Sequence, residues 1–219
     1  MIPTEILFDA VRAGDASTLG DMLTREPELL KARSEDGATL LITALYYGAE
    51  DVASLLLAHG ATMNIFEAAA AGNIPRLIEL LDADPALLGV RSHDGWTSLH
   101  LAGFFGQPDA VKLLLERGAD ATAISANPTS NMPIHAAIAG KQDPRAIAFL
   151  LEHTPDVNAP AEGGYTPLHL AAARGDLDLI RILLERGGDK AVRMNNGQTA
   201  ADLALERNHP DAARLLQPE

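Results

Sequence analysis

The chain has 219 residues, of which 47% are hydrophobic, 21% charged and 4% aromatic, and its formal net charge is −13. This composition is typical of a globular protein and argues against intrinsic disorder. The absence of cysteine excludes disulfides, cysteine nucleophiles and cysteine-based zinc sites. The acidic field repels phosphate backbones, so we expect no nucleic-acid partner.

The acidic charge is concentrated in the first half of the chain. Residues 1–110 carry 16 acidic and 6 basic side chains, whereas residues 111–219 carry 14 and 11. No segment approaches the run of about 18 apolar residues that spans a membrane. The N-terminus has no basic region before a long apolar run, which argues against a signal peptide. We therefore expect no membrane span and a cytoplasmic location.

Taken in chain order, the sequence predicts pairs of short helices joined by turns. The first helix, in residues 4–14, begins without a turn motif and is expected to cap the N-terminal end. Most second helices begin at or near a proline, where the missing N–H costs least: Pro75, Pro108, Pro144 and Pro210. The last pair carries the polar residues expected of an exposed end: Asp202, Glu206, Arg207 and Arg214.

A four-residue motif recurs at the start of the first helix in several pairs. It reads TSLH at 97–100, MPIH at 132–135, TPLH at 166–169 and TAAD at 199–202, so its copies are almost evenly spaced. Each is followed by a short helix, a glycine or asparagine, and a second helix. A nearly fixed period of this length is the signature of a repeat protein.

These residues resemble those of ankyrin repeat proteins, in particular a bacterial-type, stand-alone ankyrin repeat domain. The segments that carry the resemblance are TSLHLAGFFG (97–106), TPLHLAAARGD (166–176), LLLERGAD (113–120) and LLLAHGAT (55–62). The resemblance implies an all-α fold, an α-solenoid of about seven helix-turn-helix repeats with short β-turn hairpins, in one domain over residues 1–219. The expected units are approximately 4–36, 37–64, 65–93, 94–126, 127–160, 161–193 and 194–219.

Each unit is too small to bury its own apolar face, so stability must come from stacking. We expect the stacked units to share one continuous core that contains Leu55, Leu113, Leu150 and Leu183. In this family the TPLH histidine has a structural role, which we expect for His100, His135 and His169. No histidine pair shows the i, i+4 spacing of a helical metal site. No phosphate loop, nucleophile elbow or catalytic triad appears, so no catalytic, cofactor or metal site is predicted.

Two features depart from a regular array. Nine residues recur later in the chain at one constant offset, which indicates duplication of a two-unit segment: Phe8, Gly14, Pro27, Arg33, Ser34, Asp36, Gly37, Thr39 and Gly48 return as Phe66, Gly72, Pro85, Arg91, Ser92, Asp94, Gly95, Thr97 and Gly106. In addition, the interval from Gly48 to Gly72 is markedly shorter than the interval from Gly72 to Gly106. The third unit has therefore lost its hairpin, and Asn64 with Glu67 is predicted to form a capping box that starts the helix directly.

Aromatic residues fall at positions that face the concave, partner-binding side in the family. They are Tyr46, Tyr47, Trp96, Phe104, Phe105 and Tyr165, and the matching third-unit residues are Ala70 and Ala71. We expect a notch, with the two tyrosines on one wall, the alanines as its floor, and Phe104, Phe105 and Trp96 on the other wall. With inner helices about 10 Å apart, the notch would be roughly 20 Å across. Glu67 and Asp94 are among the acidic residues expected at its rim.

Aromatic walls and an acidic rim favour a partner segment with aromatic, leucine or basic side chains. Alternatively, each aromatic pair buries one ring and leaves the other as a modest surface patch. The sequence favours a monomeric, non-catalytic module that binds another protein through its concave face as an adaptor, scaffold or inhibitor. The alternative function is a receptor for a short peptide or small ligand in the notch.

Overall fold

The computed structural model describes residues 3–141 and 143–217, which form helices and connecting loops. The α-helices are α1 (Thr4–Arg12), α2 (Ala16–Arg25), α3 (Leu40–Tyr46), α4 (Glu50–Ala58), α5 (Ile65–Ala71), α6 (Ile74–Ala83), α7 (Ser98–Phe104), α8 (Pro108–Glu116), α9 (Pro133–Ala139), α10 (Pro144–His153), α11 (Pro167–Arg174), α12 (Leu177–Glu185), α13 (Ala200–Glu206) and α14 (Pro210–Leu216). Three 3₁₀ helices lie between them: η1 (Pro27–Lys31), η2 (Pro85–Leu88) and η3 (Glu162–Gly164).

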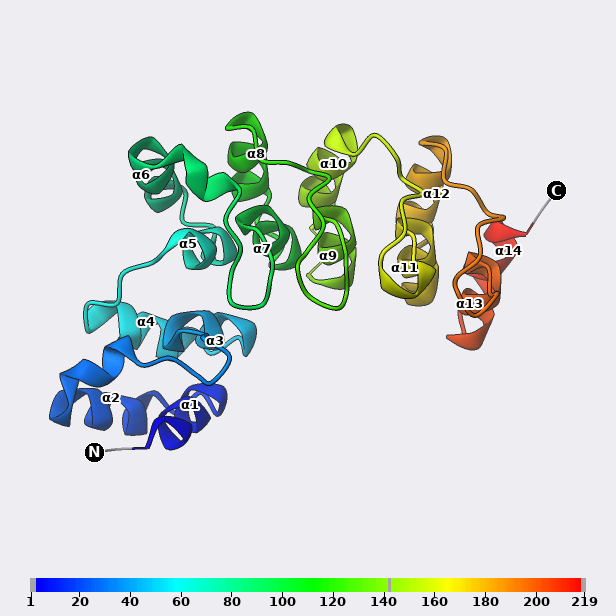
Figure 1. The fold of residues 1–219 in the computed structure, drawn as a ribbon. Helices are drawn as coiled ribbons and strands as arrows, with labels where there is room; N and C mark the ends of the chain where they lie inside the picture. Colours follow the sequence, from blue (N-terminus) through cyan, green and yellow to red (C-terminus); the bar gives the residue numbers. More distant parts are fainter. Residues whose placement is uncertain (1–2, 142, 218–219) are drawn as a thin grey trace.

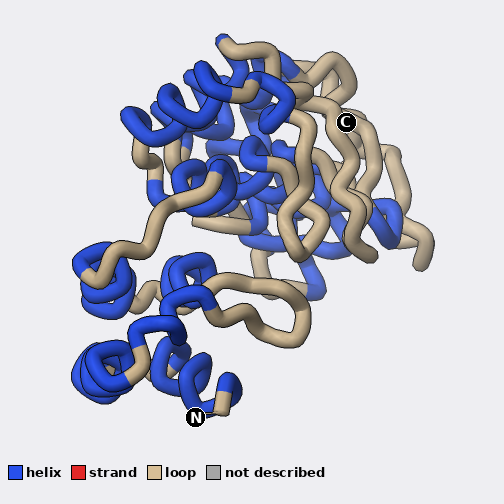
Figure 2. The backbone as a smooth tube through the Cα atoms, turned by 60° about the vertical axis from the view of Figure 1, so that its left-hand side comes forward, coloured by secondary structure: helices blue, strands red, loops and turns tan. Residues whose placement is uncertain are grey.

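The helices form an all-α solenoid, as the sequence predicts (Figure 1). Consecutive helices pair, and the pairs stack one on the next. Odd-numbered helices form one layer and even-numbered helices the other, and the hairpin loops gather on one side of the helices (Figure 2). Within the described residues, β structure is limited to two isolated bridges, Arg33 with Thr39 and Arg193 with Thr199. The predicted unit boundaries remain a prediction, although one helix pair falls within each range.

Local signals explain where these short helices begin and end. The hydroxyls of Thr39, Thr97, Thr166 and Thr199 accept hydrogen bonds from the backbone N–H three residues later, which is the usual N-cap interaction. At the other end, α5 stops at Gly72 in the left-handed conformation, with φ of 66°, which costs glycine little. Helices of seven to ten residues are marginal in isolation, so their stability comes from stacking.

The recurrence seen in the sequence is also present in the helices. The offset that relates Phe8 to Phe66 also relates the helices. After a shift by this offset, the first and last residues of α2, α3 and α4 become those of α6, α7 and α8, and the first residue of η1 becomes that of η2. The third unit begins directly with α5, without a preceding hairpin.

The apolar core is divided into clusters, so the expectation of one continuous core is wrong. One cluster draws on α1–α4, and a second extends from α5 to α14. A third, smaller cluster joins them on the odd-numbered layer and includes Ile42, Ala70, Trp96 and Phe105. The division coincides with the third unit, because its missing hairpin removes part of the contact between neighbours.

The connection from α4 to α5 contains no hairpin, and the predicted capping box is confirmed. The Asn64 side chain accepts hydrogen bonds from the backbone N–H groups of Phe66 and Glu67, and a Glu67 carboxylate oxygen accepts from the Asn64 N–H at 2.8 Å. The other oxygen accepts a hydrogen bond from the Thr39 hydroxyl. Glu67, predicted at an exposed rim, is only 2% exposed. It joins the second and third units instead, since its helix starts where a hairpin would have been.

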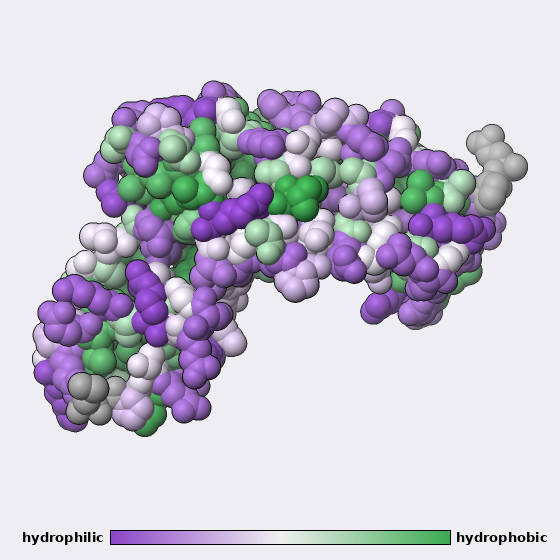
Figure 3. All heavy atoms as spheres, viewed as in Figure 1, coloured by the Kyte–Doolittle hydropathy of each residue, from purple (hydrophilic) through white to green (hydrophobic). Residues whose placement is uncertain are grey.

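Loss of this hairpin bends the array. Hairpins of the fourth to seventh units contact one another through backbone hydrogen bonds of 2.9 Å, from Ala126 to Gly95, Glu162 to Thr129 and Asn195 to Gly163. With the third hairpin absent, the second and fourth approach directly, and a Cβ built on Gly37 would lie 3.5 Å from Cβ of His93. The arm formed by α1–α4 is accordingly turned from the line of the other pairs (Figure 1). Figure 3 shows the bend in space-filling form, with hydrophilic residues over much of both arms.

The recurring histidines are buried between successive units. Nε2 of His100 donates to the carbonyl of Asn131 at 2.9 Å, and Nε2 of His135 donates to the carbonyl of Ala159 at 3.1 Å. Nδ1 of His100 lies 2.8 Å from the Thr97 hydroxyl. Burial lowers the pKa of both histidines from 6.5 to about 4. Each neutral ring thus bonds its own N-cap residue and the loop that follows its helix pair.

We expect Glu67→Ala to reduce the free energy of unfolding by about 3 kcal/mol, because it removes two hydrogen bonds to a buried carboxylate. The matched control is Asp9→Ala, at the equivalent place on α1, where the aspartate is exposed and pairs with Arg12 at 2.9 Å. Such a pair contributes less than about 1 kcal/mol. Urea denaturation followed by circular dichroism measures both, and equal losses would contradict the role assigned to Glu67.

We expect protonation of His100 and His135 to destabilise the fold as pH falls from about 6.5 to about 4. The unfolded chain binds protons there that the native chain does not, so stability rises with pH across this window. The double variant His100→Gln/His135→Gln should show a shallower slope of unfolding free energy against pH. The exposed His59→Gln provides the control. An unchanged slope in the double variant would show that these rings do not titrate on unfolding.

Candidate functional site

The aromatic pairs that end α3 and α7 lie together in one cluster. The ring of Tyr46 has its centroid 5.2 Å from that of Phe105 and 6.1 Å from that of Phe104. Phe104 also contacts Trp96, with centroids 5.1 Å apart in an edge-on arrangement. The predicted notch, with its walls roughly 20 Å apart, is therefore wrong, because the bend brings both walls into contact.

A hydrogen bond closes the same gap. The Tyr46 hydroxyl donates to one carboxylate oxygen of Asp94, and the other oxygen accepts from the Ser92 hydroxyl. Burial raises the pKa of Tyr46 far above 10.0, and the hydrogen bond to Asp94 and the negative charge of Asp94 raise it further. The phenol therefore remains protonated. Asp94 was predicted as part of an acidic rim. It is half-buried and already bonded, so it connects the second and fourth units.

The aromatic side chains differ widely in exposure. Phe105 and Trp96 are 4% and 9% exposed, Tyr46 and Phe104 are half-buried, and Tyr47 is 59% exposed. Each pair thus buries one ring more deeply than the other, which is the alternative that the sequence left open. Tyr165 contacts His169 in its own unit, with centroids 6.5 Å apart, and is not in the apolar cluster that holds Trp96 and Phe105.

An apolar groove lies beside this cluster, with a volume of about 280 Å³. It is lined by Leu45, Leu57, Ala70, Ala71 and Phe105, with Glu50 and Lys141 also at its edge. Ala70 and Ala71 therefore line this depression, and Phe105 forms part of its wall. Tyr47, directly after α3, is the most exposed large apolar side chain among the residues that the structure describes.

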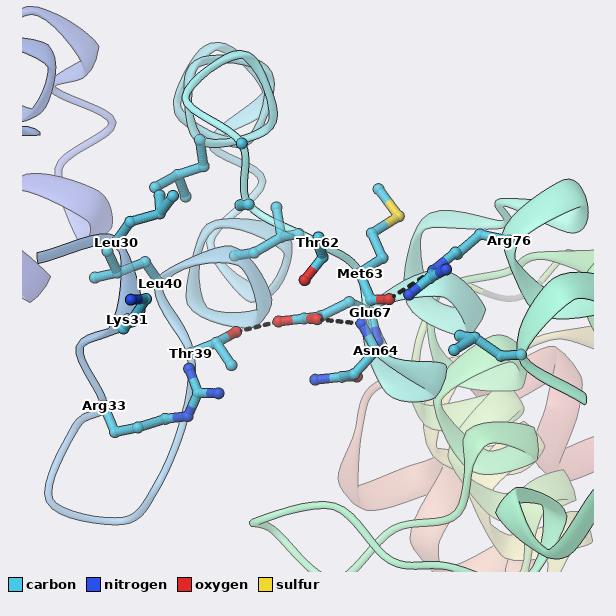
Figure 4. Close-up of a pocket in the computed structure, with 15 residues that line it drawn as sticks. Leu30, Lys31, Arg33, Thr39, Leu40, Thr62, Met63, Asn64, Glu67 and Arg76 are labelled. Atoms are coloured by element: carbon cyan, nitrogen blue, oxygen red, sulfur yellow. Dashed lines mark hydrogen bonds between the residues drawn. The ribbon is translucent and has the colours of Figure 1, made fainter. Parts of the chain in front are cut away.

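A second, basic groove was missed by the sequence reasoning. It has a volume of about 430 Å³ and lies between the end of α4 and α6, where the third hairpin would have been. Figure 4 shows Lys31 and Arg33 on one side, Arg76 on the other, and the hydrogen bond from Thr39 to Glu67 between them. The short interval from Gly48 to Gly72 was the available signal, because a missing hairpin leaves unfilled space.

Other site types have little support within residues 3–141 and 143–217. No group of three or more histidine, aspartate and glutamate side chains there is arranged to hold a metal. None of the helices described is both long enough and apolar enough to cross a bilayer. The two grooves next to the third unit and the exposed Tyr47 are the candidate sites for a partner at the bend.

Comparison with protein families matches ankyrin repeats over most of the chain. The family described as ankyrin repeats in three copies matches residues 7–125 and 65–161, and the family described as ankyrin repeats in many copies matches residues 150–204. The matched region includes both grooves and the aromatic cluster. Ankyrin repeats are in general modules for protein–protein interaction and not catalytic folds.

Similar curated proteins carry such repeats within longer chains. B-cell lymphoma 3 protein homolog of Mus musculus is 36% identical over 58% of this chain and 28% of its own length. Target of rapamycin complex 2 subunit AVO2 of Saccharomyces cerevisiae is 28% identical over 72% of this chain and 37% of its own. Putative palmitoyltransferase ZDHHC13 of Danio rerio is 30% identical over 66% and 22%. This chain thus spans well under half of each relative.

These relatives differ in name and share the repeat array with this chain, so the similarity identifies the fold and leaves the partner open. The family matches, the paired helices and the TPLH-type caps agree with one another. The chain belongs to the ankyrin repeat family.

Proposed function

We propose that the chain is a non-catalytic binding module that recognises one protein partner through the odd-numbered helix layer at the bend. It would act as an adaptor, scaffold or inhibitor, and as a monomer. The observation that carries the proposal is the apolar groove at the end of α3, where Leu45 and Gly48 line the groove and Tyr47 between them in the chain is exposed. An exposed tyrosine next to a depression lined by leucine, alanine and phenylalanine has the character of an interface hot spot.

The surroundings of Tyr47 support a rigid surface. Its neighbour Tyr46 is fixed by ring contacts with Phe104 and Phe105 and by the hydrogen bond to Asp94. Binding to such a preorganised surface loses little conformational entropy. The groove suits a leucine or aromatic side chain from the partner, and Glu50 at its edge suits an adjacent basic residue.

The size of the groove favours a protein over a small ligand. Its volume of about 280 Å³ is at the lower end of the roughly 300–1,000 Å³ that small-molecule sites occupy. A groove of this size accommodates one side chain of a larger interface. Of the remaining aromatic residues named from the sequence, half-buried Tyr165 would extend the proposed surface along the hairpin side, whereas Trp96 is only 9% exposed.

The test is a quantitative capture experiment from the lysate of the source organism with the double variant Tyr47→Ala/Ala71→Glu. Ala71 is partly exposed in the groove, so a glutamate there blocks the groove. We expect loss of a partner retained by the wild type. Once that partner is purified, Tyr47→Ala alone should weaken its affinity by about 10-fold or more.

The matched control is Ala13→Glu, because Ala13 occupies the place in the first unit that Ala71 occupies in the third, and it is exposed. It adds the same charge away from the groove, and circular dichroism confirms folding of both variants. A partner bound equally by wild type and the double variant would contradict the proposal. Saturable binding of an isolated short peptide, with no folded partner, would favour the receptor alternative.

A further inference from the structure

The basic groove is a consequence of the lost hairpin. Residues 59–64 pass from α4 directly into α5, while the second and fourth hairpins meet on the other side of the junction. The even-numbered helices on either side of this connection do not close over it. The space of about 430 Å³ between them is lined by residues 60–64, the direct connection that replaces the hairpin of the third unit.

The floor of the basic groove is apolar and its polar groups are mostly satisfied. Leu30 and Leu80 are half-buried in the lining, whereas Leu40 and Leu56 lie beneath it and are at most 2% exposed. Glu67 is the one acidic residue of the lining, and it is 2% exposed with both carboxylate oxygens accepting hydrogen bonds. The negative charge of Glu67 is therefore largely withdrawn from the open surface.

The rim of the basic groove carries positive charge, whereas the surrounding half of the chain is acidic. Residues 1–110 contain 16 acidic and only 6 basic side chains, and three of those six, Lys31, Arg33 and Arg76, line this groove. They come from separate parts of the fold: Lys31 ends η1, Arg33 lies in the loop that follows, and Arg76 is on α6. In the view of Figure 4 they stand on both sides of the opening. The fold thus gathers positive charge at one place in an acidic half.

The existing interactions of Lys31 and Arg33 are weak enough to leave both side chains available, whereas Arg76 is half-buried and more firmly held. Lys31 pairs with Glu28 at 3.0 Å, but both side chains are at least 80% exposed. Arg76 donates from Nε to the Met63 carbonyl at 2.9 Å and pairs with exposed Glu79. The Arg33 guanidinium makes a long contact, 3.5 Å to the Ala32 carbonyl. The exposed ion pair of Lys31 with Glu28 contributes little free energy.

We propose that the basic groove binds an acidic, extended peptide segment of a partner protein, in the place of the missing hairpin. Aspartate or glutamate side chains of the segment would pair with Lys31 and Arg33 on one side and Arg76 on the other. An apolar residue between them would contact the half-buried Leu30 and Leu80. This surface is separate from the Tyr47 surface, so the proposal does not depend on the function proposed above.

Fluorescence anisotropy with a labelled decapeptide in which aspartate alternates with leucine and alanine tests the proposal. The reference peptide has asparagine for every aspartate. We expect the 219-residue chain to bind the aspartate peptide about tenfold more tightly at low salt. The double variant Lys31→Glu/Arg33→Glu should lose about tenfold, and added salt should reduce the difference because it screens exposed charges.

The matched control is Arg91→Glu, because Arg91 is the counterpart of Arg33 in the duplicated segment, is also exposed, and lies outside the groove. It should change the affinity less than about twofold. The double variant should instead gain affinity for a peptide with lysine at each aspartate. Three results would overturn the proposal. They are a failure of the aspartate peptide to bind saturably, equal affinity for the asparagine peptide, and a loss of affinity in Arg91→Glu equal to that in the double variant.

Discussion

The direct connection from α4 to α5 is the constraint on which the shape of this protein depends. Hairpins in a regular array contact their neighbours, so omission of one hairpin leaves two others to meet across the gap. They meet at Gly37 and His93, and the whole N-terminal arm turns with them. The hydrogen bonds of Glu67 and Asp94 then hold the two arms on either side of the third unit.

The bend has opposite effects on the two sides of the junction. On the odd-numbered layer it brings Tyr46 against Phe104 and Phe105, so aromatic surface that a straight array would expose is used for internal packing. On the other side it leaves the basic groove open. A ligand that contacts both arms in either groove would therefore favour the angle between the arms at which it binds more tightly.

The stability of the array is distributed among many small interactions. Helices of seven to ten residues cannot persist alone in water, and each depends on its caps and its neighbours. His100 and His135 show how one side chain connects two segments, since each bonds its own N-terminal turn and the loop that follows its helix pair. The third unit lacks such a histidine, and Glu67 supplies the equivalent connection to the preceding unit.

The repeat, the α-solenoid, the cap residues and the absence of the third hairpin could all be predicted from the sequence, because these depend on local spacing and on backbone hydrogen bonds between residues close in the chain. The recurrence that relates Phe8 to Phe66 was equally visible, and the helix bounds follow it. Exposure was harder to predict: adjacent residues such as Phe104 and Phe105 point in different directions, and only the packing of neighbours determines which ring is covered.

The closure of the notch, the inward position of Glu67 and Asp94, and the meeting of Lys31, Arg33 and Arg76 in one groove were set by the tertiary structure. All three results depend on the angle between stacked units. That angle is the sum of contacts between segments far apart in the chain, and no local spacing in the sequence specifies it.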